Sequence, residues 1–530
     1  MDQRRVVVAV GLSLVVIFLY NELVLRRYQT QAPPPSAEMP APVAEDRPAG
    51  TQPPAAEPTP APPSALGAEP DDAPPVTVDT DRFRIEITPR GARLTGIQLK
   101  DFRRDVAADS PPLDLVTPGK ILPLTLQLGT RGSDASVAYT TETQRLSLHG
   151  ADKGQLVFSG EAPGGGTIEK RFEFTGDGYL LGVQAKIEGG PAVDAVGLVL
   201  TPIATAGAGG GRTPGQEQGI ALAEGKTVEK SFADLEKESV TVKGARWAGF
   251  SAQYFAIAAL PAEGDAHVVM TVSEGTPVVR VDGAAAGAVA FDVFAGPKDH
   301  DVLASAGHDL NRALDFGYFW FIALPLLRAL RLLHGVLGNY GVAIIVLTAL
   351  VKLATTPLTQ TTFRNMREMQ KLKPQIDRLR EQFKDDQMAL QKETMELYKR
   401  HHVNPLAGCL PMVLQLPIFV GLYNTLLHAI ELRHAPFMLW IHDLSAPDRL
   451  MVGGVGVPVL TLLMGGSMFL QQWLSPQQGD PSQQRVMMFM PLMFTFMFIN
   501  FPAGLVLYWL VNNVLTITQQ YFVIRQPSTS

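Results

Sequence analysis

One charged side chain is conspicuous for its place in the sequence. Lys352 lies a little past the middle of residues 340–358, an apolar stretch long enough to cross a bilayer. Neither this stretch nor the four later apolar stretches contain an Asp or Glu that could pair with it. An unpaired ammonium group is costly in hydrocarbon. The Lys352 ammonium must therefore contact water, extend on its alkyl chain to the cytoplasmic interface, or lose its proton. Lys352 is therefore a candidate functional residue.

Polar residues in the other apolar stretches favour water around Lys352. Gln415 lies in the cytoplasmic half of residues 410–430. Further polar or amphipathic residues lie toward the cytoplasmic ends of later apolar stretches: Gln471, Gln472, Trp509, Asn512, Thr516 and Gln520. The outer halves, such as residues 342–347, are almost wholly apolar. Polar residues in membrane spans normally face a cavity or the bundle interior, which predicts a wet cavity that opens inward and stops halfway. A channel would need polar residues at every depth, and Asn424 alone does not provide them.

A run of methionine and phenylalanine occupies residues 487–498. It holds Met487, Met488, Met490, Met493 and Met497, interleaved with Phe489, Phe494, Phe496 and Phe498. Methionine is flexible and polarizable, and surfaces that bind many apolar partners overuse it. The run is equally compatible with a surface for apolar client segments and with simple packing.

Composition and motifs exclude several classes of function. The chain of 530 residues has a net charge of -6 and is 46% hydrophobic, unlike a disordered protein or a nucleic-acid coat. Its single cysteine, Cys409, excludes an intrachain disulfide and multi-cysteine zinc sites. No HExxH stretch, GxSxG stretch or ATP site is visible. We therefore expect neither enzymatic activity nor a cofactor.

The N-terminal part predicts an anchor and a linker. Residues 6–25 are apolar apart from Ser13 and Asn21-Glu22, and arginines flank them, so residues 1–30 are interpreted as an uncleaved transmembrane anchor. Residues 31–75 contain fifteen of the 41 prolines and seven acidic residues. Such a segment cannot bury enough apolar surface to offset its ordering entropy, so it forms an extended linker.

A large all-β domain is predicted over residues 76–298. Apolar residues recur at every second position, as in Phe83, Ile85 and Ile87, and glycine clusters interrupt the pattern. This is typical of a β-sandwich of many short strands. The glycine run at 207–211 lacks the strand, helix and distal acid of a nucleotide-binding motif, so we interpret it as a loop.

A helix is predicted over residues 315–338, within an interfacial segment of residues 305–338. Hydropathy alone allows it to span, but Arg328, Arg331 and His334 form a polar stripe. An arginine near the bilayer centre costs about 2.5 to 3.5 kcal/mol, whereas a helix lying in the interface keeps the stripe in water. An amphipathic interfacial helix is the preferred interpretation.

Residues 339–525 predict a five-span core, which with the anchor makes a six-span α-helical membrane protein. The spans are residues 340–358, 410–430, 455–473, 486–501 and 504–522. Between the first two, residues 363–403 form a charged helical hairpin with a coiled-coil seam. Its ten Lys or Arg residues place it in the cytoplasm. Counting spans then puts both termini in the cytoplasm and the β-sandwich outside.

Several long motifs, found in order, resemble the Oxa and Albino family of membrane protein insertases in its Gram-negative YidC form. They are Asp315-Phe316-Gly317-Tyr318, Gly338-Asn339-Tyr340-Gly341, Thr356-Pro357-Leu358-Thr359, Asn404-Pro405-Leu406-Ala407-Gly408-Cys409, Leu439-Trp440-Ile441-His442-Asp443-Leu444 and Phe501-Pro502-Ala503-Gly504-Leu505. The resemblance implies an insertase and chaperone of the bacterial inner membrane. It would move client segments from the cytoplasm into the bilayer through an inward-open hydrophilic groove, alone or with the Sec translocon.

The resemblance also implies partners and site residues. The partners are nascent membrane proteins, the Sec translocon with its accessory subunits, the ribosome and membrane lipids, with no specific nucleic-acid sequence. The resemblance and the pattern of polar residues together indicate six groove residues: Lys352, Thr348, Gln415, Trp509, Asn512 and Thr516. The client contacts are Leu416, Pro417, Met490, Met493, Phe494 and Met497. Lys352 stands where the family has arginine, and the tail after Arg525 lacks a basic run that could bind the ribosome.

Two other classes of function remain as alternatives. An ion-coupled transporter could use Lys352, although proton relays usually employ Asp, Glu or His within spans, and the one candidate, His428, lies at a membrane edge. A structural membrane scaffold is the second alternative, and insertion of a client by the purified protein in liposomes would distinguish an insertase from a scaffold.

Overall fold

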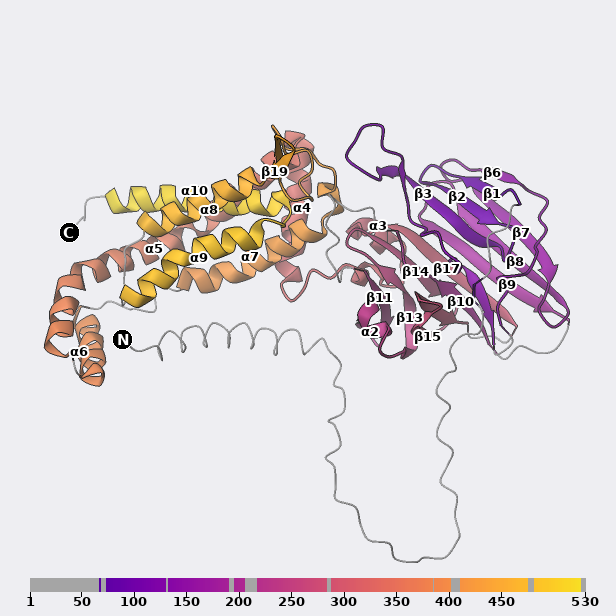
Figure 1. The fold of residues 1–530 in the computed structure, drawn as a ribbon, viewed down its shortest axis with the longest axis horizontal. Helices are drawn as coiled ribbons and strands as arrows, with labels where there is room; N and C mark the ends of the chain where they lie inside the picture. The colour runs from indigo at the N-terminus through magenta and orange to yellow at the C-terminus, as the bar shows by residue number, and fades with distance from the viewer. Residues whose placement is uncertain are drawn as a thin grey trace, which may run out of the picture.

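The computed structural model describes residues 66–67, 73–129, 132–189, 195–204, 217–283, 287–384, 386–401, 410–474 and 481–525. The anchor predicted over residues 6–25, most of the predicted linker and the glycine run at 207–211 lie outside these residues. Figure 1 shows two bodies side by side, a strand-rich one formed by the first part of the described chain and a helical bundle formed by the second.

The strand-rich body is built from two sheets. Its strands are β1 (Val76–Asp79), β2 (Phe83–Thr88), β3 (Arg93–Arg103), β4 (Pro112–Asp114), β5 (Thr125–Leu128), β6 (Arg145–Ser147), β7 (Lys153–Glu161), β8 (Thr167–Thr175), β9 (Leu180–Glu188), β10 (Val196–Leu200), β11 (Gln218–Ala223), β12 (Lys226–Ser231), β13 (Val240–Ser251), β14 (Phe255–Pro261), β15 (Ala266–Ser273), β16 (Thr276–Asp282) and β17 (Ala288–Pro297). One sheet has the order β4-β3-β2-β1-β6. The other follows β5-β10-β16-β15-β13-β14-β17-β9-β8-β7, with β11 paired to β13 and β12 paired to β11.

The alternation predicted from the sequence is confirmed in these strands. Phe83, Ile85 and Ile87 of β2 are fully buried, whereas Arg84 between them is exposed. β8 and β17 show similar alternation over most of their length. Strand β5 differs, because all four of its residues are buried. Buried side chains from both sheets form one continuous cluster, as expected for the core of a β-sandwich.

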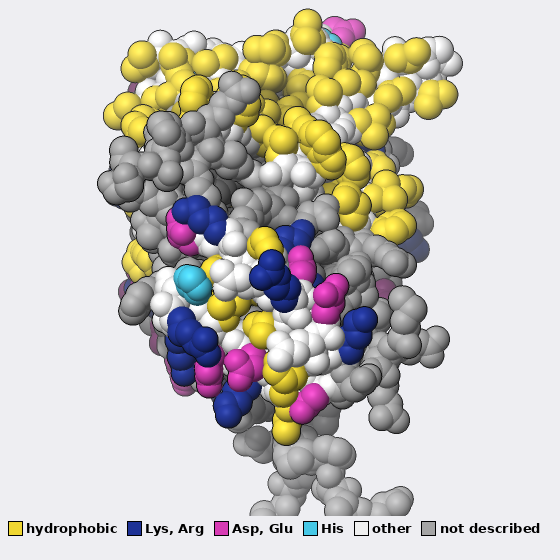
Figure 2. Space-filling model, turned by 90° about the vertical axis from the view of Figure 1, so that its left-hand side faces the viewer, with side chains coloured by type: hydrophobic (Ala, Val, Ile, Leu, Met, Phe, Trp, Pro, Cys, Tyr) yellow, Lys and Arg dark blue, Asp and Glu magenta, His cyan; other side chains and the backbone are white. Residues whose placement is uncertain are grey.

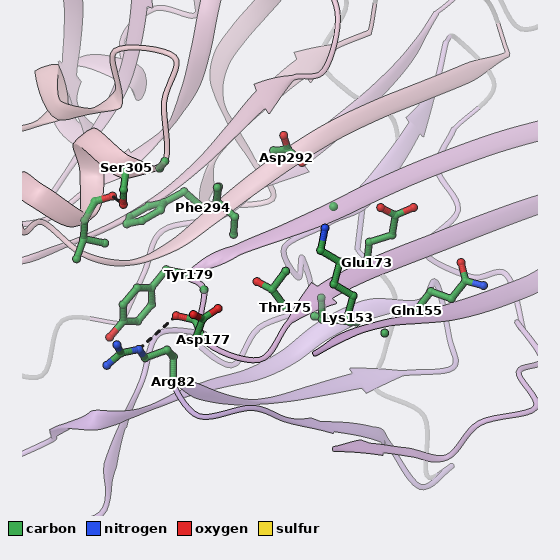
Figure 3. A pocket seen from close by; sticks show the side chains of 17 residues that line it. Arg82, Lys153, Gln155, Glu173, Thr175, Asp177, Tyr179, Asp292, Phe294 and Ser305 are labelled. Carbon is green, nitrogen blue, oxygen red and sulfur yellow. Dashed lines mark hydrogen bonds between the residues drawn. The ribbon is translucent and has the colours of Figure 1, made fainter. Parts of the chain in front are cut away.

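A cavity of about 810 Å³ opens on the surface of the β-sandwich. It lies over β7, β8, β9 and β17, beside the short helix α3 (His300–Ser305), and its lining mixes acidic, basic and aromatic side chains. Figure 3 shows Lys153, Glu173 and Thr175 on the strands, with Tyr179 and Phe294 nearer to α3. None of the site residues predicted from the sequence lines this cavity.

The segment that joins the two bodies departs from the helix predicted within residues 305–338. It contains α3, the 3-10 helix η2 (Leu310–Ala313) and α4 (Trp320–Leu337). Left-handed backbone at Gly307, Asp309 and Gly317, with φ of 79°, 58° and 70°, interrupts helical structure between them. The helix therefore begins at Trp320, and its predicted start at residue 315 is wrong.

Helix α4 lies across the bundle. By length and composition it could cross a membrane, yet Figure 1 shows it running across the sandwich-side end of the other helices. The predicted polar stripe implied that Arg331 of α4 lies in water, but the residue is paired with carboxylates. Its guanidinium pairs with Asp299 and Asp301 at the start of α3, at 2.7 Å each, and also with Glu431. Arg331 therefore connects α4 to the start of α3 and to the 3-10 helix η4 (Ile430–Leu432), which holds Glu431.

Besides α4, the described part of the bundle contains six helices. They are α5 (Tyr340–Gln382), α6 (Gln387–Arg400), α7 (Leu410–His428), α8 (Val459–Leu474), α9 (Pro481–Phe498) and α10 (Ala503–Arg525). The short helices α2 (Phe232–Leu235) and η4 (Ile430–Leu432) lie outside this set. Helix α5 unites the first predicted core span with the first arm of the predicted hairpin, and its Met369, Leu372 and Ile376 pack with Tyr398 of α6.

One predicted span is wrong at its start. Residues 455–457 form strand β19 (Val455–Val457), which pairs with β18 (Leu450–Val452) in a short hairpin, so that α8 begins only at Val459. Asp448 stabilises this start of α8. Its carboxylate accepts the N–H of Leu460 at 2.7 Å and the hydroxyl of Thr461 at 2.8 Å, as side chains at helix N-termini do.

The β-sandwich and the bundle also meet near Lys298, directly after β17. The Lys298 side chain is buried, and its ammonium donates to Ser251 Oγ at 2.9 Å and to the carbonyl of Ala252 at 3.0 Å. Burial lowers the pKa of Lys298 to about 8. The neighbouring Gln253 donates from its amide to the carbonyl of Leu427 in α7 at 3.0 Å. These contacts dock the sandwich on the end of α7.

Candidate functional site

Polar residues predicted around Lys352 come together between α5, α7 and α10. The Lys352 ammonium donates to Thr516 Oγ1 at 2.7 Å and to Asn512 Oδ1 at 3.3 Å, both on α10. Gln415 of α7 donates from its amide to the same Asn512 oxygen at 3.2 Å. We call Lys352, Gln415, Asn512 and Thr516 the polar cluster. Lys352 is only 5% exposed, whereas Gln415, Asn512 and Thr516 are half-buried.

The charge of Lys352 is held by neutral groups. Its two hydrogen-bond acceptors are an amide oxygen and a hydroxyl. The sequence places no Asp or Glu in the apolar stretches around it. A cation in low-dielectric surroundings without a counter-ion attracts any carboxylate that approaches. The polar cluster can therefore bind an acidic group without giving up an existing ion pair.

Counting residues along the helices gives the depth of the polar cluster. Lys352 follows the first residue of α5 by twelve positions and Asn512 follows the first residue of α10 by nine. At about 1.5 Å per residue, they lie about 18 Å and 14 Å from the sandwich-side end. Gln415 precedes the sandwich-side end of α7 by thirteen positions, about 20 Å. All three distances are close to half the thickness of a hydrocarbon layer, which is about 30 Å.

The bundle changes from apolar to polar at this depth. Between the cluster and the β-sandwich, α5 and α10 contribute buried apolar residues: Ala343, Ile344, Leu347, Leu505, Val506 and Leu507. Toward the opposite end, polar contacts continue, with the Gln519 amide donating to the Thr356 hydroxyl at 2.8 Å and the Gln520 amide to the carbonyl of Leu474 at 2.9 Å. The predicted division into an apolar and a polar half is thus present along α5 and α10, whereas α7 and α8 also bury Thr425 and Thr461 in their sandwich-side parts.

Two of the predicted groove residues are not hydrogen-bonded to the polar cluster. Thr348 is buried, and its hydroxyl donates to the carbonyl of Ile344 one turn earlier at 2.6 Å. Trp509 belongs to an aromatic group instead. Its ring centroid lies 4.7 Å from that of Phe419 in α7 and 6.0 Å from that of Phe494 in α9. Trp509 therefore connects α7 with α9 from its place on α10.

The predicted client-contact residues divide into exposed and packed ones. The exposed ones are Leu416 of α7 at 56% and, in α9, Met490 at 40%, Met493 at 61% and Met497 at 49%. The three methionines are spaced by three and four residues, so they share one side of α9. Phe494 packs inward on Trp509, and Pro417 is half-buried within α7. The exposed side chains are all apolar.

The end of the bundle away from the β-sandwich has a different surface. Figure 2 faces this end and shows Lys, Arg, Asp and Glu side chains intermixed below, with hydrophobic side chains covering the surface above and beside them. The mixed charges belong to the region of α6 and the end of α5, where Lys371 pairs with Glu368 and Arg400 with Glu396. The charged hairpin residues are thus separated from the apolar surface of the bundle.

Some polar contacts of the bundle were missed by sequence reasoning. Asn513 of α10 donates to Ser467 Oγ of α8 at 3.0 Å, on the side away from Asn512. Gln519 follows Asn512 by seven positions and therefore shares its face, so helical spacing could have indicated Gln519 as well as Gln520. Asn424, considered only as a channel residue, donates to the carbonyl of Phe316 at 2.7 Å and holds the segment before α4.

The fold and the polar cluster together define a class of protein. It has a bundle of long apolar helices with a large β-sandwich at one end, and a lysine buried about halfway along the bundle whose acceptors among the described residues are neutral.

Comparison with known proteins identifies the family. A family model described as 60Kd inner membrane protein matches residues 332–529, and one described as YidC periplasmic domain matches residues 75–329. A membrane protein insertase YidC from Geobacter sulfurreducens is 39% identical over 100% of this chain and 99% of its own length. One from Pelobacter propionicus is 36% identical over 98% of this chain and 99% of its own length. A crystal structure of an active YidC insertase covers 86% of this chain and 95% of that chain, with 18% identity and a TM-score of 0.38.

The chain belongs to the YidC family of bacterial inner membrane proteins. The resemblance indicated by the sequence motifs is confirmed, and the β-sandwich is the periplasmic domain of this family. The relatives are named membrane protein insertases.

Proposed function

We infer that this chain is a membrane protein insertase, which moves client transmembrane segments from the cytoplasm into the lipid bilayer. The polar cluster carries this inference, because it combines a cation and three neutral polar groups about halfway along the bundle, with buried apolar residues of α5 and α10 on its sandwich side. Membership of a family whose relatives are named insertases supports it. Polar residues that extend only halfway along the bundle are compatible with a protein that carries a polar client segment part of the way across the bilayer. A pore would need polar residues along its whole length.

The polar cluster would lower a barrier that the bilayer imposes. A hydrophilic client segment has to cross about 30 Å of hydrocarbon, where each unpaired polar group costs several kcal/mol. We propose that the segment enters the cytoplasmic half of the bundle, where Gln415, Asn512 and Thr516 offer hydrogen-bond partners. Only the periplasmic half of the hydrocarbon then remains to be crossed.

Lys352 would add a preference for acidic client segments. Its ammonium is bound by neutral acceptors alone among the described residues, so an incoming carboxylate gains a full electrostatic attraction. The family's arginine can bind a carboxylate through two parallel hydrogen bonds, whereas lysine acts as a compact point charge. We therefore expect Lys352 to attract acidic segments without fixing their orientation.

The apolar helix of the client would leave along α7 and α9. Both helices have an exposed apolar surface, formed by Leu416 on α7 and by the exposed methionines on α9. Flexible methionine side chains adapt to helices of different shape. Release of an apolar helix into lipid is favourable, so the step needs no ATP or cofactor.

The proposed topology has six spans, namely the anchor at residues 6–25 and helices α5, α7, α8, α9 and α10. Helix α4 would lie in the periplasmic interface, and the hairpin of α5 and α6 in the cytoplasm because of its ten basic residues. Both termini would then be cytoplasmic. We propose nascent membrane proteins, the Sec translocon, the ribosome and lipids as partners, with ribosome contact resting on the hairpin.

Reconstitution tests the proposed function. A client with one transmembrane segment and an acidic flank is synthesised beside liposomes that contain the purified chain, and protection of the flank from protease is measured. We expect protection with the natural chain, less with Lys352→Met, and an unchanged amount with Lys371→Met, which removes a surface lysine of the hairpin. Equal protection in protein-free liposomes would contradict the insertase function and favour a structural scaffold.

A further inference from the structure

The hairpin of β18 and β19 has an unusual composition for an exposed element. Residues 450–457 are all Leu, Met, Val or Gly, without one polar side chain. At its tip, Met451, Val452 and Val455 are 66%, 57% and 66% exposed. Gly453 and Gly454 form the turn with φ of 58° and 84°. An isolated two-stranded hairpin is at best marginally stable in water, so its apolar tip requires a partner surface.

The base of the hairpin is held firmly in the bundle. The Arg449 guanidinium donates to the carbonyl of Ile499 at 2.8 Å and to Asn500 Oδ1 at 3.1 Å, directly after α9. On the other side, Asp448 binds the first turn of α8 through Leu460 and Thr461. The hairpin therefore projects from a fixed point where α8 begins and α9 ends.

This fixed point lies at the periplasmic end of the bundle. Figure 1 shows β19 beside α4, at the end of the helices that faces the β-sandwich. Helix α8 starts two residues after β19, and its early exposed residues, Leu462 and Leu463, are 53% and 54% exposed. In an inner membrane protein this surface of α8 faces lipid, and the apolar tip of the hairpin continues it.

Pairing in the hairpin restricts how deep it can lie. Val452 and Val455 are cross-strand partners and share one face, whereas Met451, opposite Gly456, projects from the other. Both faces of the tip are thus apolar. The outer edges of a two-stranded sheet leave N–H and C=O groups unpaired, and such edges do not occur in the hydrocarbon core. The boundary between headgroups and acyl chains satisfies both requirements.

We propose that the β18–β19 hairpin is a lipid anchor that places Met451, Val452 and Val455 at this boundary in the outer leaflet. Because Arg449 and Asp448 tie the hairpin to α9 and α8, the anchor sets the depth of the periplasmic ends of both helices. The proposal rests on the location of the chain in the inner membrane and not on insertion of clients. Its failure would therefore leave the proposed function untouched.

Fluorescence quenching tests the anchor in the full chain. In a variant with Cys409→Ser, a single cysteine at Val452 or Val455 carries an environment-sensitive fluorophore, and the protein is placed in nanodiscs of phosphatidylethanolamine and phosphatidylglycerol. Quenchers are lipids spin-labelled near the headgroup, lipids spin-labelled near the end of the acyl chain, and aqueous iodide. Leu470 is the deep lipid control, because it is 44% exposed and lies about 17 Å along α8 from its periplasmic start. Lys186, 66% exposed on β9, is the water control.

We expect shallow spin labels to quench both hairpin positions at least about twofold more than deep labels, as for elements buried only at the interface. Leu470 should show the opposite order, and Lys186 should respond only to iodide. Two hairpin positions are used so that one poorly folded variant does not decide the result. Quenching by iodide alone at both would mean that the hairpin is free in water for a protein partner, and this would overturn the proposal. Quenching as deep as at Leu470 would overturn it too.

Discussion

Replacing Lys352 by methionine is expected to remove the charge of the polar cluster at little cost to folding. Asn512 Oδ1 would keep its bond from the Gln415 amide at 3.2 Å. The Thr516 hydroxyl would keep its bond to the carbonyl of Asn512 at 2.6 Å. No buried donor is left without an acceptor, and unpaired buried groups are the costly outcome of such substitutions. Methionine also fills a similar volume, so a loss of insertion reports on the charge.

The expected size of the effect follows from Coulomb's law. A client carboxylate about 6 Å from the Lys352 ammonium gains about 3 kcal/mol at an effective dielectric constant of about 20, against about 0.7 kcal/mol in water. The difference of about 2 kcal/mol corresponds to about thirtyfold in rate if it acts fully in the limiting step. We therefore expect Lys352→Met to slow insertion of an acidic client by about tenfold to thirtyfold, and of a neutral client by less than about twofold.

Initial insertion rates in proteoliposomes provide the assay. Two clients that differ only by Asp or Asn in the translocated flank are compared in the natural chain, Lys352→Met, Lys352→Arg and Lys352→Glu. The arginine variant should keep or raise the rate because it keeps the charge, and the glutamate variant should fail most with the acidic client. Lys371→Met controls for loss of a positive charge elsewhere. Equal losses for both clients would refute an electrostatic role of Lys352.

Other parts of the chain give independent tests. A cysteine at Lys384, with Cys409 replaced, should react only from the cytoplasmic side because the hairpin carries ten basic residues; labelling by an impermeant maleimide in intact cells would contradict the topology. Arg331→Ala should lower the free energy of unfolding by about 2 to 4 kcal/mol, because Glu431, whose side chain is 14% exposed, loses its partner. An unchanged unfolding midpoint in denaturant would exclude a stabilising role of Arg331. From pH 8 to 10.5 the free energy of unfolding of the natural chain should rise on the order of 3 kcal/mol relative to that of Lys298→Met, because Lys298 loses its proton at a lower pH in the folded than in the unfolded chain. Parallel profiles of unfolding free energy against pH for the two proteins would refute this.

Regular periodicity explains what the sequence predicted well. Strands β2, β8 and β17 bury mainly one face over most of their length, so their apolar residues recur at every second position. The polar cluster was accessible for a similar reason. Helices advance by a fixed rise, so the depth of Lys352 in one span could be compared with that of Asn512 and Thr516 in another by counting residues.

Interrupted elements and contacts distant in sequence explain the errors. Residues 455–457 are as apolar as the α8 span that follows, and only Gly453-Gly454 and Pro458 indicate the break. The cluster of Arg331 joins residues 30 and 100 positions away, which no local pattern can reveal. The charged stripe on α4 predicted water, and Arg328 is indeed exposed, but at Arg331 the fold supplies carboxylates.

Crosslinking of a stalled client tests the proposed path most directly. A photoreactive phenylalanine is placed at Thr516 in the polar cluster, at Met493 on α9 or, as a matched control, at Leu470 on α8, which is also lipid-exposed. We expect the polar flank of the client to crosslink from Thr516 and its apolar helix to crosslink from Met493, with neither captured from Leu470 above background. Equal capture of the apolar helix from Leu470 and Met493, together with no capture of the flank from Thr516, would contradict it.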